Sequence, residues 1–240
     1  MAERPSEARS EGAAHFREEI SLFRPMSFRW LVGLTDMRLT LTQFVTLDGV
    51  YQAPGGPTED TSGDFRHGGW LVPFFDDVLG QYMTRIFGEV DAFVLGRKTY
   101  EIFAASWPKA TDPDDPIASR LNTLPKYVAS RSLARADWQN STVFDGDVVA
   151  EVGKLKEEPG RELQIHGSGA LAQTLFDAGL IDAVRLIVFP VVLGSGKRLF
   201  AEGRTPSSFR LADVTSTPSG VTMQTLELTG PPEYGAVEIE

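Results

Sequence analysis

Residues 162–193 read ELQIHGSGALAQTLFDAGLIDAVRLIVFPVVL and decide the fold class. The stretch at 162–165 predicts a strand, and the glycine-rich turn after it precedes a helix over 170–178 that Gly179 ends. The strongly apolar run at 185–193 predicts a second strand. A strand, a helix and a strand in this order form a parallel pair covered by the helix, so the stretch predicts an α/β protein.

The same alternation extends from this stretch in both directions. A strand is predicted at 38–45, an amphipathic helix at 74–87, a buried strand at 91–95 and a helix at 98–105. Further strands are predicted at 125–129 and 141–144, and a further helix at 148–157. Strands at 209–216 and 221–228 flank a turn and predict an antiparallel hairpin. The whole pattern predicts a mainly parallel, helix-covered sheet that ends in this hairpin.

Residues 37–230 contain no linker or internal repeat and are predicted to form one domain. Residues 1–36 are polar and of mixed charge over much of their length, and we predict a flexible N-terminal extension there. The alternative is a short helix at 13–23 that packs on the domain or on a partner. Residues 231–240 begin with two prolines and are predicted to be a loose tail.

Composition excludes several classes of protein. The chain has 240 residues with 23 basic and 33 acidic side chains, a formal net charge of −10, which argues against a broad surface for nucleic acid or anionic membrane. It has no cysteine and only three histidines, so disulfides, thiolate chemistry and a multi-histidine metal site are not expected. No apolar run approaches the roughly 20 residues that span a bilayer, so a cytoplasmic protein is expected.

The turn Gly167-Ser168-Gly169-Ala170 is the first candidate site. It lies between a predicted strand and a predicted helix, where glycines permit a close approach and free backbone N–H groups attract a phosphate. The alternative is an ordinary tight turn, because the third glycine of the dinucleotide-binding fingerprint is absent. His166, directly before the turn, is a weaker candidate for ligand contact.

Two basic segments follow other predicted strands. The run Gly96-Arg97-Lys98-Thr99 offers two cations and a hydroxyl at a helix start, which suits a phosphate. Its alternative is a solvated basic cap with Thr99 as the helix N-cap. Ser130-Arg131 follows the strand predicted at 125–129. Because ligands of open α/β sheets bind at the carboxyl ends of strands, the three sites together favour a nucleotide.

Carboxylates supply the third kind of candidate. Asp48, in the turn Thr46-Leu47-Asp48-Gly49, is predicted to orient a substrate amine or to relay a proton, if partial burial raises its pKa toward neutral. The alternative is an ordinary Asp-Gly turn. Asp76 and Asp77 are candidates for the same role, or simply complement the dipole of the helix that starts there. His67, in the long loop at 46–69, and Trp70, directly after it, are further candidates to line a pocket.

Four stretches carry a family resemblance: VTLDG at 45–49, DAFVLGRKTY at 91–100, the glycine turn and helix at 165–175, and AGLIDAVRLIVFPVVLGSG at 178–196. Together they resemble the dihydrofolate reductase-like superfamily. The last stretch is most similar to the stand-alone relatives of the reductase domain of bacterial riboflavin biosynthesis, the RibD C-terminal domain family. No stretch resembles the deaminase domain of the bifunctional riboflavin enzyme.

The resemblance implies a three-layer fold, with helices on both faces of the sheet, and a homodimer that binds NADPH and a small substrate. Gly96, Arg97, Lys98, Thr99, Ser130 and Arg131 would hold the phosphate and adenine-ribose end. The turn 167–170 would cradle the pyrophosphate, and 47–49 would lie near the nicotinamide or substrate. Among the carboxylate candidates, Asp48 is the expected catalytic residue, and Asp48 and Asp77 are the acids expected to contact the substrate, although Asp77 does not stand at the family's matching position.

The implied reaction is hydride transfer from C4 of the nicotinamide to a C=N or C=O carbon. The expected substrate is a small heterocycle or a ribosylaminopyrimidine, as in 5-amino-6-(5-phosphoribosylamino)uracil reductase. The alternatives are dihydrofolate reductase proper and a non-catalytic NADPH-binding module.

Overall fold

The computed structural model describes residues 36–237 except 113, 201 and 204. The strands are β1 (Arg38–Thr46), β2 (Val90–Gly96), β3 (Lys126–Ala129), β4 (Ser141–Val143), β5 (Glu162–His166), β6 (Ala183–Phe189), β7 (Ser208–Ser216) and β8 (Thr222–Gly230). The helices are α1 (Asp77–Glu89), α2 (Arg97–Ser106), α3 (Pro116–Thr123), α4 (Val148–Lys156) and α5 (Gly169–Asp177). The extension predicted at 1–36 lies outside the described residues but for its last one.

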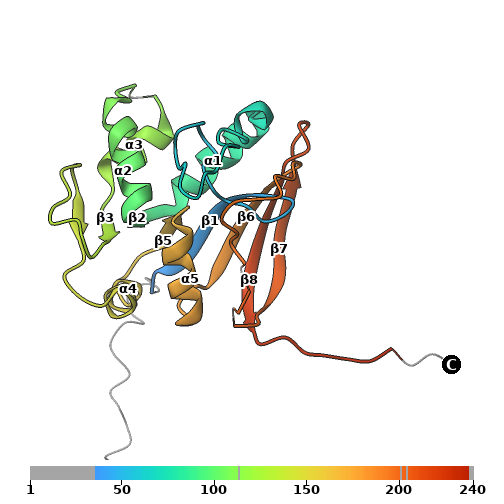
Figure 1. Cartoon of the computed structure of the whole chain (residues 1–240). Coiled ribbons are helices and arrows are strands. Elements are labelled where there is room, and N and C mark those ends of the chain that lie inside the picture. The colour runs from blue at the N-terminus through green and yellow to red at the C-terminus, as the bar shows by residue number, and fades with distance from the viewer. Residues whose placement is uncertain (1–35, 113, 201, 204, 238–240) are drawn as a thin grey trace, which may run out of the picture. The chain divides into compact units, whose positions relative to one another are not determined.

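The strands form one sheet in the order β4-β3-β2-β5-β1-β6-β8-β7. The pairs from β4 to β6 are parallel, while β8 pairs antiparallel with both β6 and β7 (Figure 1). The predicted α/β class, the mainly parallel sheet and the C-terminal hairpin are therefore confirmed.

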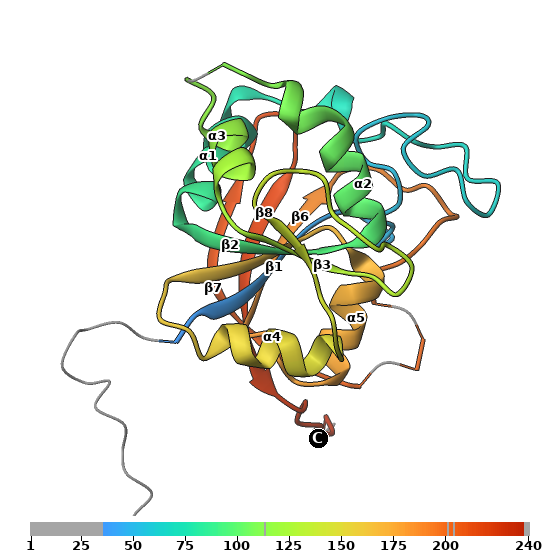
Figure 2. The same ribbon diagram turned by 90° about the vertical axis from the view of Figure 1, so that its left-hand side faces the viewer.

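Helices cover both faces of the parallel part of the sheet, as Figure 2 shows. Leu79 of α1 and Leu121 of α3 pack in one apolar core, and Val152 of α4 and Leu175 of α5 pack in the other. The β2 strand contributes to both cores because its side chains alternate between the two faces. This burial on both faces fits the apolar sequences of β2 and β6, whereas β1 and β5 also bury polar side chains.

Several predicted boundaries differ from the structure. The strand predicted at 185–193 is β6, which ends at Phe189 because Pro190 has no N–H to continue the ladder. The first long helix begins at Asp77 rather than at 74, since Pro73 lies in a separate 3-10 turn, Val72–Phe74. The sequence reading missed α3, although Asp115 followed by proline is a typical helix start.

The long loop after β1 is packed rather than splayed into solvent. Phe65 and Trp70 are buried in the core on the α1 face, and the Trp70 indole donates a hydrogen bond to the Gln52 carbonyl at 2.8 Å. The loop thereby returns to the carboxyl edge of the sheet.

After β8, residues 231–237 carry no regular secondary structure. Along the described part of the chain, helices are too short or too polar to cross a membrane.

Candidate functional site

The carboxyl ends of β2 and β5 lie side by side and launch helices on opposite faces of the sheet. The two strands are parallel neighbours, α2 follows β2 directly, and α5 begins three residues after β5. Tyr100 of α2 lies in one core and Leu171 of α5 in the other. The chain leaves β2 toward β3 and leaves β5 toward β6, in opposite directions along the sheet. Such a switch point at the carboxyl edge of the strands is where open α/β sheets bind ligands.

Hydrogen bonds join the two helix starts. The Gly96 N–H donates to Ser168 Oγ at 2.9 Å, and the Ser168 N–H donates to Thr99 Oγ1 at 3.2 Å. Ser168 has a left-handed backbone with φ 56°, as does Gly167 with φ 58°. The structure therefore brings together two segments that the sequence suggested separately. Thr99 is not the N-cap of α2; that position belongs to Gly96.

These two helix starts differ from the others in their capping. The side chains of Asp76, Asp115 and Asp147 accept backbone N–H groups at the starts of α1, α3 and α4. In the described structure α2 and α5 have no side-chain cap and no acidic residue in the first turn. Their first N–H groups and the positive ends of their dipoles thus remain available to an anion.

The predicted cations lie at the same edge but are not all free. Arg97 forms an i,i+4 ion pair with Glu101 at 2.9 Å. Lys98 forms an ion pair with Asp60 of the long loop at 3.3 Å. Ser130 follows Ala129, which is the register partner of Gly96. Its hydroxyl accepts the N–H groups of the following turn, and Arg131 is exposed. All three sequence-predicted basic or glycine-rich segments therefore reach one edge.

Asp48 is a charged anchor. Its carboxylate accepts the Thr46 hydroxyl at 2.6 Å and the backbone N–H groups of Leu193 at 3.2 Å and Gly194 at 2.9 Å, and it faces Arg198 at 3.3 Å. The Thr46 hydrogen bond, with those from 193 and 194, outweighs desolvation and lowers the pKa of Asp48 to about 2. The expectation of a pKa raised toward neutral is wrong, because these donors stabilise the charged form.

The other loop and helix candidates have structural partners. Asp76 caps α1 by accepting the Leu79 N–H at 3.0 Å, it also accepts the Ser219 N–H at 3.2 Å, and these bonds lower its pKa. Asp77 is exposed in the first turn of the same helix. Trp70 is buried, whereas His67 is exposed and contacts the edge of the Phe65 ring.

His166 is a buried, neutral side chain. Its ring packs among those of Phe44, Phe87 and Phe103, and Nδ1 lies 3.3 Å from Gln164 Oε1. Burial lowers the pKa of His166 to about 4, so the imidazole is uncharged at neutral pH. The histidine supports the β5–α5 turn from the apolar core beneath it.

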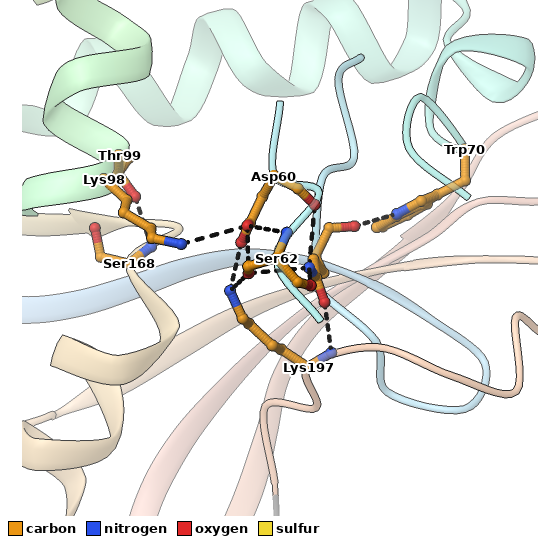
Figure 3. A network of polar contacts seen from close by, with 8 residues as sticks. Asp60, Ser62, Trp70, Lys98, Thr99, Ser168 and Lys197 are labelled. Carbon is orange, nitrogen blue, oxygen red and sulfur yellow. Dashed lines mark hydrogen bonds and ion pairs between the residues drawn. The ribbon is translucent and has the colours of Figure 1, made fainter. Parts of the chain in front are cut away.

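A polar network that the sequence reading did not identify lies beside the paired helix starts (Figure 3). Lys197, from the loop after β6, pairs with Asp60 of the long loop at 2.5 Å and donates to Ser62 Oγ at 2.7 Å. Asp60 also pairs with Lys98. The Lys197–Asp60 contact spans 137 residues, and neither residue stands in a motif that would have revealed it.

A glycine at the start of α5 is required by its neighbour. A Cβ on Gly169 would lie 2.3 Å from Cζ of Tyr51, so the tyrosine ring packs directly on the turn.

Two cavities lie elsewhere in the described structure. One of about 250 Å³ is lined by Glu162 and Arg185, and one of about 770 Å³ by Tyr100 and Trp138. The lining residues of neither cavity include the glycine turn.

Known proteins resemble this chain over most of its length. The RibD C-terminal domain matches residues 38–223. Uncharacterized protein YyaP of Bacillus subtilis (strain 168) is 30% identical over 192 residues, which cover 79% of this chain and 94% of YyaP. Uncharacterized protein YwjB of the same organism is 30% identical over 167 residues, or 70% of this chain and 84% of YwjB.

Solved structures share the fold. A putative riboflavin biosynthesis protein from Shewanella sp. PV-4 has a TM-score of 0.59 at 22% identity, covering 80% of this chain and 99% of that one. A diaminohydroxyphosphoribosylaminopyrimidine deaminase/5-amino-6-(5-phosphoribosylamino)uracil reductase from Thermotoga maritima has a TM-score of 0.54 at 15% identity, covering 81% of this chain and 57% of that one. Because the family match extends over most of the domain, the chain belongs to the RibD C-terminal domain family, a family of NAD(P)H-dependent reductases with the dihydrofolate reductase-like fold.

Proposed function

We propose that the protein is an NADPH-dependent reductase of a small heterocyclic or ribosylaminopyrimidine-like substrate. The observation that carries the proposal is the pair of uncapped, acid-free helix starts of α2 and α5, joined through Ser168 at the switch point between β2 and β5. In an otherwise acidic protein, this arrangement suits the pyrophosphate of a dinucleotide.

The residues present fit a phosphorylated cofactor. The turn Gly167-Ser168-Gly169 supplies backbone N–H groups without side-chain bulk, and Lys98 and Thr99 stand at the start of the neighbouring helix. Arg97 and Arg131 are exposed at the same edge and would hold the ribose 2′-phosphate that distinguishes NADPH from NADH. Arg97 would exchange Glu101 for this phosphate.

The cofactor, when bound, would supply a hydride to a C=N or C=O carbon of the substrate. The chain would bind and orient the two molecules and exclude water. Asp48 would hold the end of β1 against residues 193–194, and its low pKa assigns it a fixed negative charge at neutral pH. That charge suits a substrate amine better than proton transfer.

The substrate class rests on the family membership and on this carboxylate. Of the two acids expected to meet substrate, Asp48 is half-buried in the turn at the end of β1, whereas Asp77 is exposed in the first turn of α1. We therefore infer that the substrate binds beside the turn at 46–49. The Thermotoga maritima protein, whose name includes a uracil reductase, has the same fold and supports a pyrimidine as the first compound to test.

The test is a titration of the purified protein with NADPH and, separately, NADH, followed by thermal shift or calorimetry. Saturable binding that favours NADPH is expected, and Arg131→Gln should weaken it about tenfold or less, the scale of one partly exposed charge. Arg135→Gln is the matched control, because Arg135 pairs with Asp137 away from the glycine turn. A well-folded protein that binds neither nucleotide would overturn the proposal.

We also propose that the protein is a homodimer. The β7 strand is an edge strand, and Leu211 and Val214 on it are 52% and 54% exposed. Exposed apolar side chains on a long edge strand favour association with a second chain. Light scattering should give a molar mass in solution twice that of one chain, and Leu211→Glu should reduce this mass to that of one chain. Val192→Glu, at an apolar residue exposed in the loop after β6, should leave the dimer mass unchanged.

A further inference from the structure

Asp60 lies between two lysines from distant parts of the chain. Its Oδ2 is 2.5 Å from Lys197 Nζ, and its Oδ1 is 3.3 Å from Lys98 Nζ (Figure 3). Lys98 belongs to the first turn of α2, whose N-terminus is uncapped, and Lys197 to the loop after β6. A carboxylate of the long loop thus occupies a cationic site at the edge where we propose that the nucleotide binds.

The position of Asp60 is built by further contacts. The Ser62 backbone N–H and hydroxyl both donate to Asp60 Oδ1, at 3.2 and 2.6 Å. Buried Gln52 donates to the carbonyls of Asp60 and Ser62, and its Oε1 accepts the Lys197 N–H at 3.1 Å. The turn at 60–62 is therefore fastened to the loop after β6 by both side-chain and backbone groups.

The charges in this cluster do not balance. Two ammonium groups pair with the Asp60 carboxylate, and the positive end of the α2 dipole adds to the excess. The adjacent Glu59 carboxylate interacts with the Asp60 charge but is bound by the N–H groups of Gly55 and Gly56. Desolvation raises the pKa of Asp60, but the hydrogen bonds from Lys197 and Ser62 lower it by a larger amount. The net pKa lies below the ordinary value, so Asp60 stays charged. A phosphate, with more charge and more acceptor oxygens than a carboxylate, would satisfy both lysines and the dipole better.

We propose that Lys98 and Lys197 form a binding site for a phosphate group of the ligand, and that Asp60 occupies this site until the phosphate displaces it. The inference rests on the proposed function. The phosphate belongs either to the nucleotide cofactor or to a phosphorylated substrate. Asp60 then acts as an internal competitor, and its displacement frees Lys197 and the Ser62 N–H from the carboxylate while Gln52 still holds the backbone of the turn.

Internal competition predicts that removal of the Asp60 charge strengthens phosphate binding. Asp60→Asn keeps the size of the side chain, and it should tighten binding by roughly three- to tenfold, the value of one partly exposed ion pair. Asp64→Asn is the matched control: Asp64 lies in the same loop, is exposed and forms no ion pair with the described residues. Adding Lys197→Gln to Asp60→Asn should abolish the gain.

The source of the phosphate is read from two probes, NADPH and ribose 5-phosphate, titrated by calorimetry into these variants. A gain confined to NADPH assigns the site to the cofactor, and a gain confined to ribose 5-phosphate assigns it to the substrate. Equal affinities in wild type, Asp60→Asn and Asp64→Asn would overturn the inference while leaving the proposed function intact. Failure of all variants to bind NADPH would instead overturn the proposed function.

Hydrogen–deuterium exchange of the wild type tests displacement without any substitution. The ligand used is NADPH, or ribose 5-phosphate if that is the probe that binds Asp60→Asn more tightly. At saturation it should slow exchange near residues 168–171 or 96–99 and speed exchange at 60–62. Faster exchange at 60–62 is expected because the Ser62 N–H loses its Asp60 acceptor. Slower exchange at 60–62, together with slower exchange at the helix starts, would mean that the loop closes over the ligand with Asp60 in place. That result would contradict displacement.

Discussion

Gly96 donates its backbone N–H to the side-chain hydroxyl of Ser168 at 2.9 Å, across 72 residues of sequence. The same serine donates its hydroxyl to the His166 carbonyl at 3.1 Å, and its own N–H goes to Thr99. One small side chain thereby fixes the spacing between the first turns of α2 and α5. The proposed pyrophosphate site depends on that spacing.

Ser168→Ala should weaken both the fold and the nucleotide site. It leaves the half-buried Gly96 N–H without its acceptor, which costs about 1–3 kcal/mol of unfolding free energy. NADPH affinity should fall with it, because the two helix starts are no longer joined. Urea denaturation and NADPH titration measure the two effects. Ser195→Ala, at an exposed position of the loop after β6, should change neither quantity.

Gly169→Ala should be destabilising even though alanine is the better helix former. The new Cβ would meet the Tyr51 ring at 2.3 Å, so the ring or the turn must shift, at a cost of about 1–3 kcal/mol. In a chain that already carries Tyr51→Ala, Gly169→Ala should cost little, whereas in a Tyr51→Phe chain, which keeps the ring, it should cost as much as in the wild type. An equal cost of Gly169→Ala in the wild type and in the Tyr51→Ala chain would contradict the assigned contact.

His166 predicts a loss of stability in mild acid. Its folded-state pKa of about 4 lies below the ordinary value of 6.5, so the unfolded chain binds the proton more tightly. The contribution of neutral His166 to the free energy of unfolding is fully present above about pH 7. It is lost as pH falls from 6.5 toward 4, by an amount on the order of 3 kcal/mol. His166→Asn should flatten the curve in this window, relative to wild type and to exposed His67→Asn. An unchanged slope would contradict the depressed pKa.

Asp48→Asn should lower stability and leave the pH profile of activity near neutrality unchanged in shape. The substitution weakens the hydrogen bonds from 193 and 194 and removes the charge that faces Arg198, at a cost of about 1–3 kcal/mol. Because the pKa of Asp48 is about 2, it does not titrate between pH 5 and 9. Loss of a kinetic pKa in that range on Asp48→Asn would restore Asp48 as a proton relay.

The sequence could predict the site only in pieces. Gly167 and Gly169 stand between a strand and a helix, which is local information, and the basic run at 96–99 stands in the same relation to its strand. That these two turns touch follows from the pairing of β2 with β5. The Asp60–Lys197 pair was missed because nothing in the sequence around either residue indicates a distant partner.

By itself, the sequence determined the order of the strands and of the helices other than α3, the glycine turn and the family resemblance. These depend on apolar periodicity, on backbone freedom and on short motifs, all of which act over a few neighbouring residues. Only the tertiary structure decided that β5 lies between β2 and β1, that Asp48 is held charged and His166 neutral, and that Asp60 sits between two lysines. The physical reason is that strand order, burial and electrostatic environment depend on contacts between residues far apart in the chain, which a local pattern does not encode.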